Sequence, residues 1–165
     1  MTVREYSSPC GKLLLGVTGD KLCLCDWLVE GRIEKTLRRI NRNINERDPS
    51  DDAAILNFAE TQLNEYFAGR RKEFTLPIET FGTEFQRNVW RALGKIPYGE
   101  TVNYKFIAES IGCGSSVRAV ANAVGANALS VIIPCHRVIG SNGSPGGYAG
   151  GPDAKRYLLV LERQL

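Results

Sequence analysis

The chain has little of what marks membrane, secreted or metal-binding proteins. It has one histidine, His136, and no apolar run near the roughly 18 residues of a transmembrane helix. Its first residues lack the basic and then apolar pattern of a secretory signal, so we expect a cytoplasmic protein that does not enter membranes. The five cysteines are an odd number without the spacing of a disulfide framework, which favours reduced thiols.

The sequence is also poor in metal ligands. By count alone, Cys10, Cys23, Cys25 and Cys113 could form a zinc site. However, Cys23 and Cys25 are separated by a single residue, without the loop that usually lies between two ligands, and the histidine lies beside Cys135 instead. We therefore expect no metal and no cofactor.

Composition is that of an ordinary globular protein, but charge is unevenly distributed. Apolar residues make up 43% and charged residues 24% of the 165 residues, enough for one domain or two small ones. Residues 1–80 contain 12 basic and 13 acidic side chains, whereas residues 81–165 contain nine and five. The basic excess in the second half is expected if that half contacts phosphates, although a solvated face would explain it equally well.

The first third of the sequence predicts a small sheet with flanking helices. Strand-like runs at residues 3–6, 12–17 and 21–28 are separated by turn compositions. Helical spacing follows over residues 31–45, and a second helix begins after a loop at residues 48–52 that ends in good N-cap residues. No catalytic constellation is found here. The outer face of the first helix is more typical of a solvated surface than of a nucleic-acid contact, and contains Arg38, Arg39 and Arg42.

A change of composition at residues 75–83 predicts a domain boundary. We expect a scaffold domain over residues 1–78 and a mostly helical domain over residues 79–165. The fold class is α/β, of the α+β kind, with the small sheet in the first domain and a helix-turn-helix in the second.

The second half is predicted to contain four main helices. They span residues 83–93, 104–111, 117–124 and 153–163, and the glycine turn at residues 112–114 makes the middle two a helix-turn-helix candidate. The side chains predicted to face the core include Phe106, Ile107, Leu158 and Tyr157, and Ser115 and Ser116 are the predicted caps of the third helix.

The third of these helices has an unusually smooth surface. Most of its residues are small or apolar, and Arg118 carries its only charge. A helix that reads the major groove would present several long polar side chains, so this one is better suited to a shallow minor groove with Arg118 as an inserted probe. The alternative is a buried helix from which Arg118 reaches solvent.

Residues 131–138 combine a cysteine with the only histidine. The β-branched residues 131–133 predict a short buried strand or extended segment, and Pro134 ends its pairing and sets Cys135 at a corner. A thiol beside an imidazole and a guanidinium has surroundings that favour a thiolate, whereas a packed core thiol is the alternative. The glycine-rich loop that follows, residues 139–151, is either a mobile surface loop or bare backbone that approaches a ligand closely.

The run Pro134-Cys135-His136-Arg137-Val138 resembles the active-site signature of the O6-alkylguanine-DNA alkyltransferases. The resemblance covers residues 81–165 in detail and the first third only in general layout. It implies that Cys135 accepts the alkyl group, that His136 relays its proton and that Glu162 holds the histidine.

The resemblance also implies roles for residues outside this run. Asn127 would brace the active-site turn, Tyr104 would help to turn the nucleotide out and bind its base, and Arg118 would fill the space left in the duplex. Further DNA-contacting positions on the same helix are Ser116, Val117, Ala119 and Ala121. The pocket positions are Val124, Val138, Tyr148 and Ala149. Departures from the pattern of some members occur at Val124, Ser130 and Ala149, and bear on pocket width only.

The resemblance therefore implies a DNA repair protein that takes an alkyl group from O6-alkylguanine in double-stranded DNA onto Cys135, once per molecule and without a cofactor. We expect a monomer, because the sequence indicates no oligomer interface. One alternative is a non-catalytic module that binds alkylated DNA, against which the presence of Cys135 counts. Another is a helix-turn-helix regulator that responds to alkylation, although such regulators usually carry a further metal domain. A cysteine hydrolase is disfavoured because the sole histidine is the immediate neighbour of the nucleophile.

Overall fold

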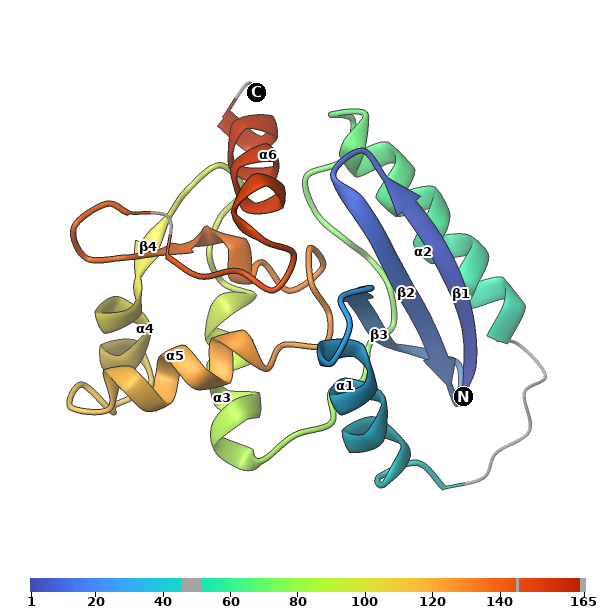
Figure 1. Cartoon of the computed structure of the whole chain (residues 1–165), viewed down its shortest axis with the longest axis horizontal. Helices are drawn as coiled ribbons and strands as arrows, with labels where there is room; N and C mark the ends of the chain where they lie inside the picture. Colours follow the sequence, from blue (N-terminus) through green and yellow to red (C-terminus); the bar gives the residue numbers. More distant parts are fainter. Residues whose placement is uncertain (46–51, 145, 164–165) are drawn as a thin grey trace. The chain divides into compact units, whose positions relative to one another are not determined.

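The chain forms two compact units, Met1–Phe81 and Gly82–Leu165. The computed structural model describes residues 1–45, 52–144 and 146–163. The predicted cap residues 48–51 lie outside the described residues. Figure 1 shows the first unit in blue to green and the second in yellow-green to red.

The first unit is built on a three-stranded antiparallel sheet. Its strands β1 (Thr2–Ser8), β2 (Gly11–Thr18) and β3 (Lys21–Trp27) are neighbours in chain order. Gly19 and Asp20, at φ of 57° and 63°, form the tight turn between β2 and β3, a backbone conformation that suits a two-residue hairpin. The predicted sheet is confirmed.

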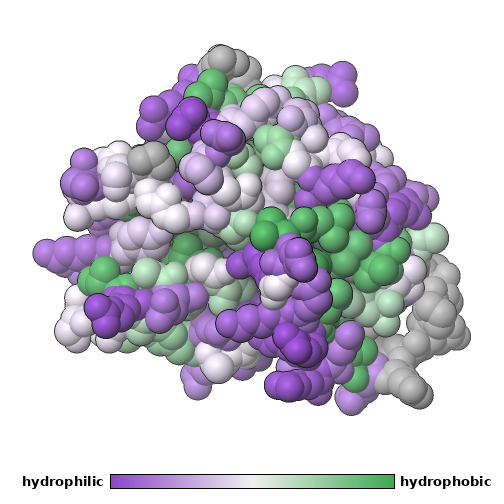
Figure 2. All heavy atoms as spheres, in the orientation of Figure 1, coloured by the Kyte–Doolittle hydropathy of each residue, from purple (hydrophilic) through white to green (hydrophobic). Residues whose placement is uncertain are grey.

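Two helices cover this sheet. Helix α2 (Asp52–Phe67) packs on all three strands, and α1 (Arg32–Asn41) packs on β3 and ends earlier than predicted. The exposed face of α1 is hydrophilic (Figure 2) and includes Lys35 and Arg38, as expected for a solvated helix. The core between sheet and helices contains Leu13, Leu15, Leu22, Leu24, Leu56, Ala59 and Leu63.

The second unit is mostly helical, with one short parallel strand pair. Its elements are α3 (Glu84–Leu93), β4 (Val102–Asn103), α4 (Tyr104–Ser110), α5 (Val117–Gly125), β5 (Val138–Ile139) and α6 (Pro152–Arg163). A capping box between Thr83 and Gln86 begins α3, because each residue's side chain accepts a hydrogen bond from the other's backbone N–H.

Helices α4 and α5 pack against each other as the predicted helix-turn-helix, and both also pack on α3 (Figure 1). The indole N–H of Trp90 donates to the carbonyl oxygen of Ala123 at 2.8 Å, which fixes the C-terminal half of α5 on α3. The predicted burial of Phe106 is wrong, since its side chain is 55% exposed. Ile107 is buried as predicted, together with Ala108, and the side chain of Asn103 caps the start of α4.

Ser116 occupies the predicted cap position at the start of α5, although its side chain makes no capping hydrogen bond there. One further prediction about a helix surface is wrong. Tyr157 is 38% exposed, because the inner face of α6 is taken by Lys155, Leu158 and Glu162. In the part of the chain that the structure describes, no helix is long and apolar enough to span a membrane.

Candidate active site

The turn before the cysteine differs from the predicted extended segment. The apolar run 131–133 is buried at both ends, but it forms a turn in which Val131 has a φ of 72°, a rare conformation for a β-branched residue. Asn127 supplies the hydrogen bonds that a strand partner would make: its Nδ2 donates to the Ile133 carbonyl at 2.9 Å, and its Oδ1 accepts from the Leu129 N–H at 3.0 Å. Asn127 therefore stabilises a compact turn where periodicity predicts a strand.

Pro134 sets the corner at which Cys135 lies. Its φ of −79° and ψ of 64° are those of an inverse γ-turn, and the Cys135 N–H donates to the Ile133 carbonyl at 2.8 Å. A short 3₁₀ turn, Cys135–Arg137, follows directly. The Cys135 side chain is only 6% exposed. The thiol is thus held in a fixed position with restricted access, as the sequence predicts for this proline.

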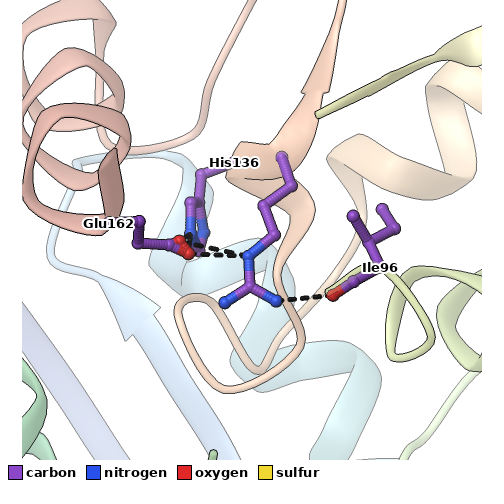
Figure 3. Close-up of polar contacts among 4 residues, drawn as sticks. Ile96, His136 and Glu162 are labelled. Carbon is purple, nitrogen blue, oxygen red and sulfur yellow. Dashed lines mark hydrogen bonds and ion pairs between the residues drawn. The ribbon is translucent and has the colours of Figure 1, made fainter. Parts of the chain in front are cut away.

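His136 and Glu162 are fully buried and in contact. The Nε2 atom of His136 lies 3.0 Å from both carboxylate oxygens of Glu162, which reaches it from α6 (Figure 3). Because an ionised carboxylate only accepts hydrogen bonds, Nε2 carries the proton and Nδ1 has the lone pair of the neutral ring. Nδ1 is buried and has no hydrogen-bond partner among the described residues. It is therefore the available proton acceptor of the imidazole.

Burial and neighbouring charges fix the protonation of this pair. Burial lowers the pKa of His136; the hydrogen bond and charge of Glu162 oppose this only in part, and the charges of Arg137 and Lys155 lower it further. Burial alone would raise the pKa of Glu162, but the contacts with His136 and Arg137 outweigh it and hold that pKa below its usual range. The cluster therefore contains a neutral imidazole beside an ionised carboxylate.

Two buried cations accompany the pair, and periodicity does not predict either of them. Arg137 donates through Nε to Glu162 at 2.6 Å, so its guanidinium is bound to the carboxylate. Lys155 is fully buried, and its Nζ donates to the carbonyl oxygens of Val138 at 2.6 Å and Gly147 at 3.4 Å. The signal that could have identified Lys155 is its place on the inner face of α6, two turns before Glu162.

Tyr104 and the glycine-rich loop lie close to this cluster. Burial, and then the charge of a Cys135 thiolate, raise the pKa of Tyr104. Burial lowers the pKa of Lys155, and the charge of the same thiolate opposes that shift. The side chains of Tyr104 and Lys155 therefore both lie within electrostatic reach of the Cys135 sulfur. A Cβ added at Gly146 would lie 3.4 Å from Tyr104 Oη and 3.8 Å from Lys155 Nζ. The loop backbone therefore approaches both side chains closely.

The remaining predicted pocket positions are spread over three segments. Val124 is buried at the end of α5 and Val138 is buried in β5, whereas Tyr148 and Ala149 are partly exposed in the glycine-rich loop. Their contribution to a substrate pocket stays a prediction.

Helix α5 presents an exposed face rather than being buried. Val117, Arg118 and Ala119 are exposed, Ser116 and Ala121 are partly exposed, and the opposite side packs inward through Val120, Ala123 and Val124. The alternative of a buried helix is therefore wrong. A role in DNA binding stays a prediction for these residues.

Metal ligation finds no support within residues 1–45, 52–144 and 146–163. No group of three or more His, Cys, Asp or Glu side chains in these segments is arranged to hold a metal ion.

Two family models together match nearly the whole chain. The 6-O-methylguanine DNA methyltransferase ribonuclease-like domain matches residues 1–80, and the DNA binding domain of the same family matches residues 84–164. The chain belongs to the 6-O-methylguanine DNA methyltransferase family. The predicted resemblance is thereby confirmed.

Individual members of this family share substantial sequence and structure with the chain. Methylated-DNA--protein-cysteine methyltransferase of Mycolicibacterium paratuberculosis is 53% identical over 106 residues, 64% of each chain. The inducible enzyme of that name from Bacillus subtilis is 48% identical over 114 residues, 69% of this chain and 63% of the relative. The aligned regions therefore span slightly less than two thirds of these relatives.

A solved member of the family matches over almost the full length. The Mycobacterium tuberculosis protein in complex with DNA is 41% identical, with a TM-score of 0.81 over 98% of this chain and 92% of that one. A further crystal structure, of the M. tuberculosis O6-methylguanine methyltransferase, gives a TM-score of 0.80 at 39% identity. The predicted α+β fold is confirmed by this match.

We predict that His136 makes the stability of the protein depend on pH. Its pKa is lowered on folding, so the unfolded chain binds the proton more tightly, and stability is lost as pH falls from the ordinary value of 6.5 through the folded pKa. The unfolding free energy, measured by urea titration between pH 7.5 and 5.5, should fall more steeply in the wild type than in His136→Gln. Equal slopes would show that the imidazole is not held neutral.

Proposed function

We propose that this protein repairs DNA by transferring the alkyl group of O6-alkylguanine to Cys135, once per molecule. The observation that carries the proposal is a buried cysteine at a rigid corner, followed by a neutral His136 that is held by Glu162 and has a free acceptor at Nδ1. Membership of the 6-O-methylguanine DNA methyltransferase family supports the substrate.

The first step is removal of the thiol proton. Nδ1 of His136 takes this proton from Cys135 through a bridging water, and the ring becomes a cation. Glu162 stabilises the cation through its contact with Nε2, at 3.0 Å, and keeps the ring in the orientation in which Nδ1 accepts the proton of Cys135. Lys155 lies within electrostatic reach of the sulfur and favours the resulting thiolate.

The second step is a single displacement at the alkyl carbon. The Cys135 sulfur forms a bond to that carbon while the bond from the carbon to O6 breaks, and the electron pair of the broken bond passes to the base. The base leaves as an anion and takes up a proton from solvent, while the His136 cation releases the thiol proton to solvent. We assign Tyr104 to hydrogen-bond the base. The thioether on Cys135 has no good leaving group and no second base to release it. One turnover follows, without metal or cofactor.

The target base must leave the stack before it can reach a buried thiol. Flipping a nucleotide costs a few kcal/mol, and a side chain that fills the gap offsets part of this cost. Arg118 is exposed on the smooth face of α5 and is the only charged residue of that helix. We assign it to the gap in the duplex, with Ser116, Val117, Ala119 and Ala121 against the minor groove. The proposed partner is double-stranded DNA containing O6-alkylguanine, bound by a monomer in the cytoplasm.

The proposal predicts that Cys135→Ala abolishes loss of the methyl group from a duplex with one O6-methylguanine, because no other thiol is presented by the cluster. Cys113→Ala, which alters a partly exposed thiol in the glycine turn, is the matched control and should react like the wild type. The measurement is the amount of unmethylated guanine formed per protein, expected to stop at about one equivalent. Continued repair by Cys135→Ala would refute the proposal; tight lesion binding without repair by the wild type would favour a binding module.

For Arg118→Ala we expect a defect that depends on the duplex. Its transfer rate on duplex DNA should fall by about 10- to 100-fold, because no side chain then offsets part of the few kcal/mol needed to flip the nucleotide out. Its rate with free O6-alkylguanine base should change little, since no base has to be flipped. Arg156→Ala, which removes another exposed arginine, from α6, is the control for lost charge. Equal loss on both substrates would contradict the assignment.

A further inference from the structure

The Glu162 carboxylate has a second buried partner besides the histidine. Arg137 donates through Nε to both oxygens of Glu162, at 2.6 and 3.1 Å, and only 7% of the arginine is exposed. Figure 3 shows the carboxylate of Glu162 facing His136 on one side and a guanidinium on the other. The carboxylate is therefore shared between an imidazole and a permanent cation.

The guanidinium is itself fixed from the other direction. Its Nη1 donates to the carbonyl oxygen of Ile96 at 2.7 Å, and its central carbon lies 5.6 Å from the centre of the Tyr98 ring. Ile96 and Tyr98 belong to the segment between α3 and β4. Arg137 thus connects this segment to α6 through Glu162, and its fork has little freedom to turn away from the carboxylate.

The charges around the imidazole show what Arg137 contributes. His136 faces two charged side chains of α6, Glu162 and Lys155. In its own turn it lies between Cys135 and Arg137. Tyr98, in the segment after α3, faces the guanidinium and the carboxylate. A neutral imidazole donates a hydrogen bond to Glu162 but supplies no positive charge. The only cation that directly contacts the buried carboxylate, among the described residues, is therefore Arg137.

We propose that Arg137 is a positioning residue for the transfer reaction: its charge holds Glu162 as an ionised carboxylate and also opposes a second proton on His136, so that the ring stays neutral with its proton on Nε2 and its lone pair on Nδ1. The catalytic use of that lone pair rests on the function proposed above. The electrostatic part concerns the cluster alone and can be tested without any substrate.

Loss of the arginine charge should leave an extra proton in the cluster. Without the arginine charge, the buried carboxylate draws a proton onto the imidazole, which then carries protons on both Nε2 and Nδ1. Nδ1 can then no longer accept the proton of Cys135. The acid limb of the pH profile of the transfer rate should therefore move to higher pH.

The single histidine of the chain allows a direct measurement. Its imidazole signals in a proton–nitrogen NMR titration need no assignment, because no other histidine is present. Arg137→Gln keeps a hydrogen-bond donor for Glu162 but removes the charge, whereas Arg137→Lys keeps the charge. Arg91→Gln removes an exposed arginine from α3 and is the matched control. Arg137→Met provides a second neutral variant if Arg137→Gln does not fold.

We expect the imidazole of the wild type, Arg137→Lys and Arg91→Gln to stay neutral at pH 6.5 and to take up a proton only below it, and the imidazole of Arg137→Gln to take up a proton at clearly higher pH than these three. An unchanged titration in the folded neutral variant would overturn the proposal.

The transfer rate adds a second readout. In Arg137→Gln, the rate at pH 6 relative to that at pH 8.5 should fall about tenfold further than in the wild type, the order of effect of one neighbouring charge on a proton equilibrium. An equal loss at all pH values would reduce Arg137 to a structural role and overturn the proposal. If the wild type transfers nothing but the titration shifts as expected, the proposed function fails while the electrostatic role of Arg137 stands.

Discussion

The buried carboxylate of Glu162 is the constraint on which the site depends. An ionised group this deep in a protein is costly unless it is paired and hydrogen-bonded, and Glu162 meets both conditions through His136 and Arg137. Both partners belong to the same three-residue turn that begins at Cys135. The final helix therefore fixes the orientation of the whole turn, and with it the position of the nucleophile.

The exposed helix and the cysteine turn are connected over a short stretch of chain. Helix α5 ends at Gly125, and two residues later Asn127 bonds the backbone on both sides of the turn that leads to Cys135. The same helix is anchored on α3 by the Trp90 side chain. A surface suited to DNA and a buried thiol are thus parts of one hydrogen-bonded framework inside the second unit. This arrangement suits a reaction in which binding must deliver a flipped base to a fixed nucleophile.

Periodicity predicted the strands and the main helices because one face of each element is buried. The contact between His136 and Glu162 was predicted by the resemblance to a known family. Prediction was wrong where a side chain competes with regular pairing: Asn127 satisfies the backbone around Val131, so a β-branched run forms a turn. It missed Lys155 because a lysine is usually exposed, so that its place on the inner face of α6 gained meaning only when the fold brought the carbonyl oxygens of Val138 and Gly147 beside it. Such groups are recognised only once the fold has brought them together.

The most direct test of the account is the intact mass of the protein after incubation with duplex DNA carrying one O6-methylguanine, followed by peptide mapping. The account predicts a gain of a single methyl group, located on Cys135, that is absent after incubation with unmodified duplex. No gain in mass, or a methyl group on another of the cysteines, would contradict it.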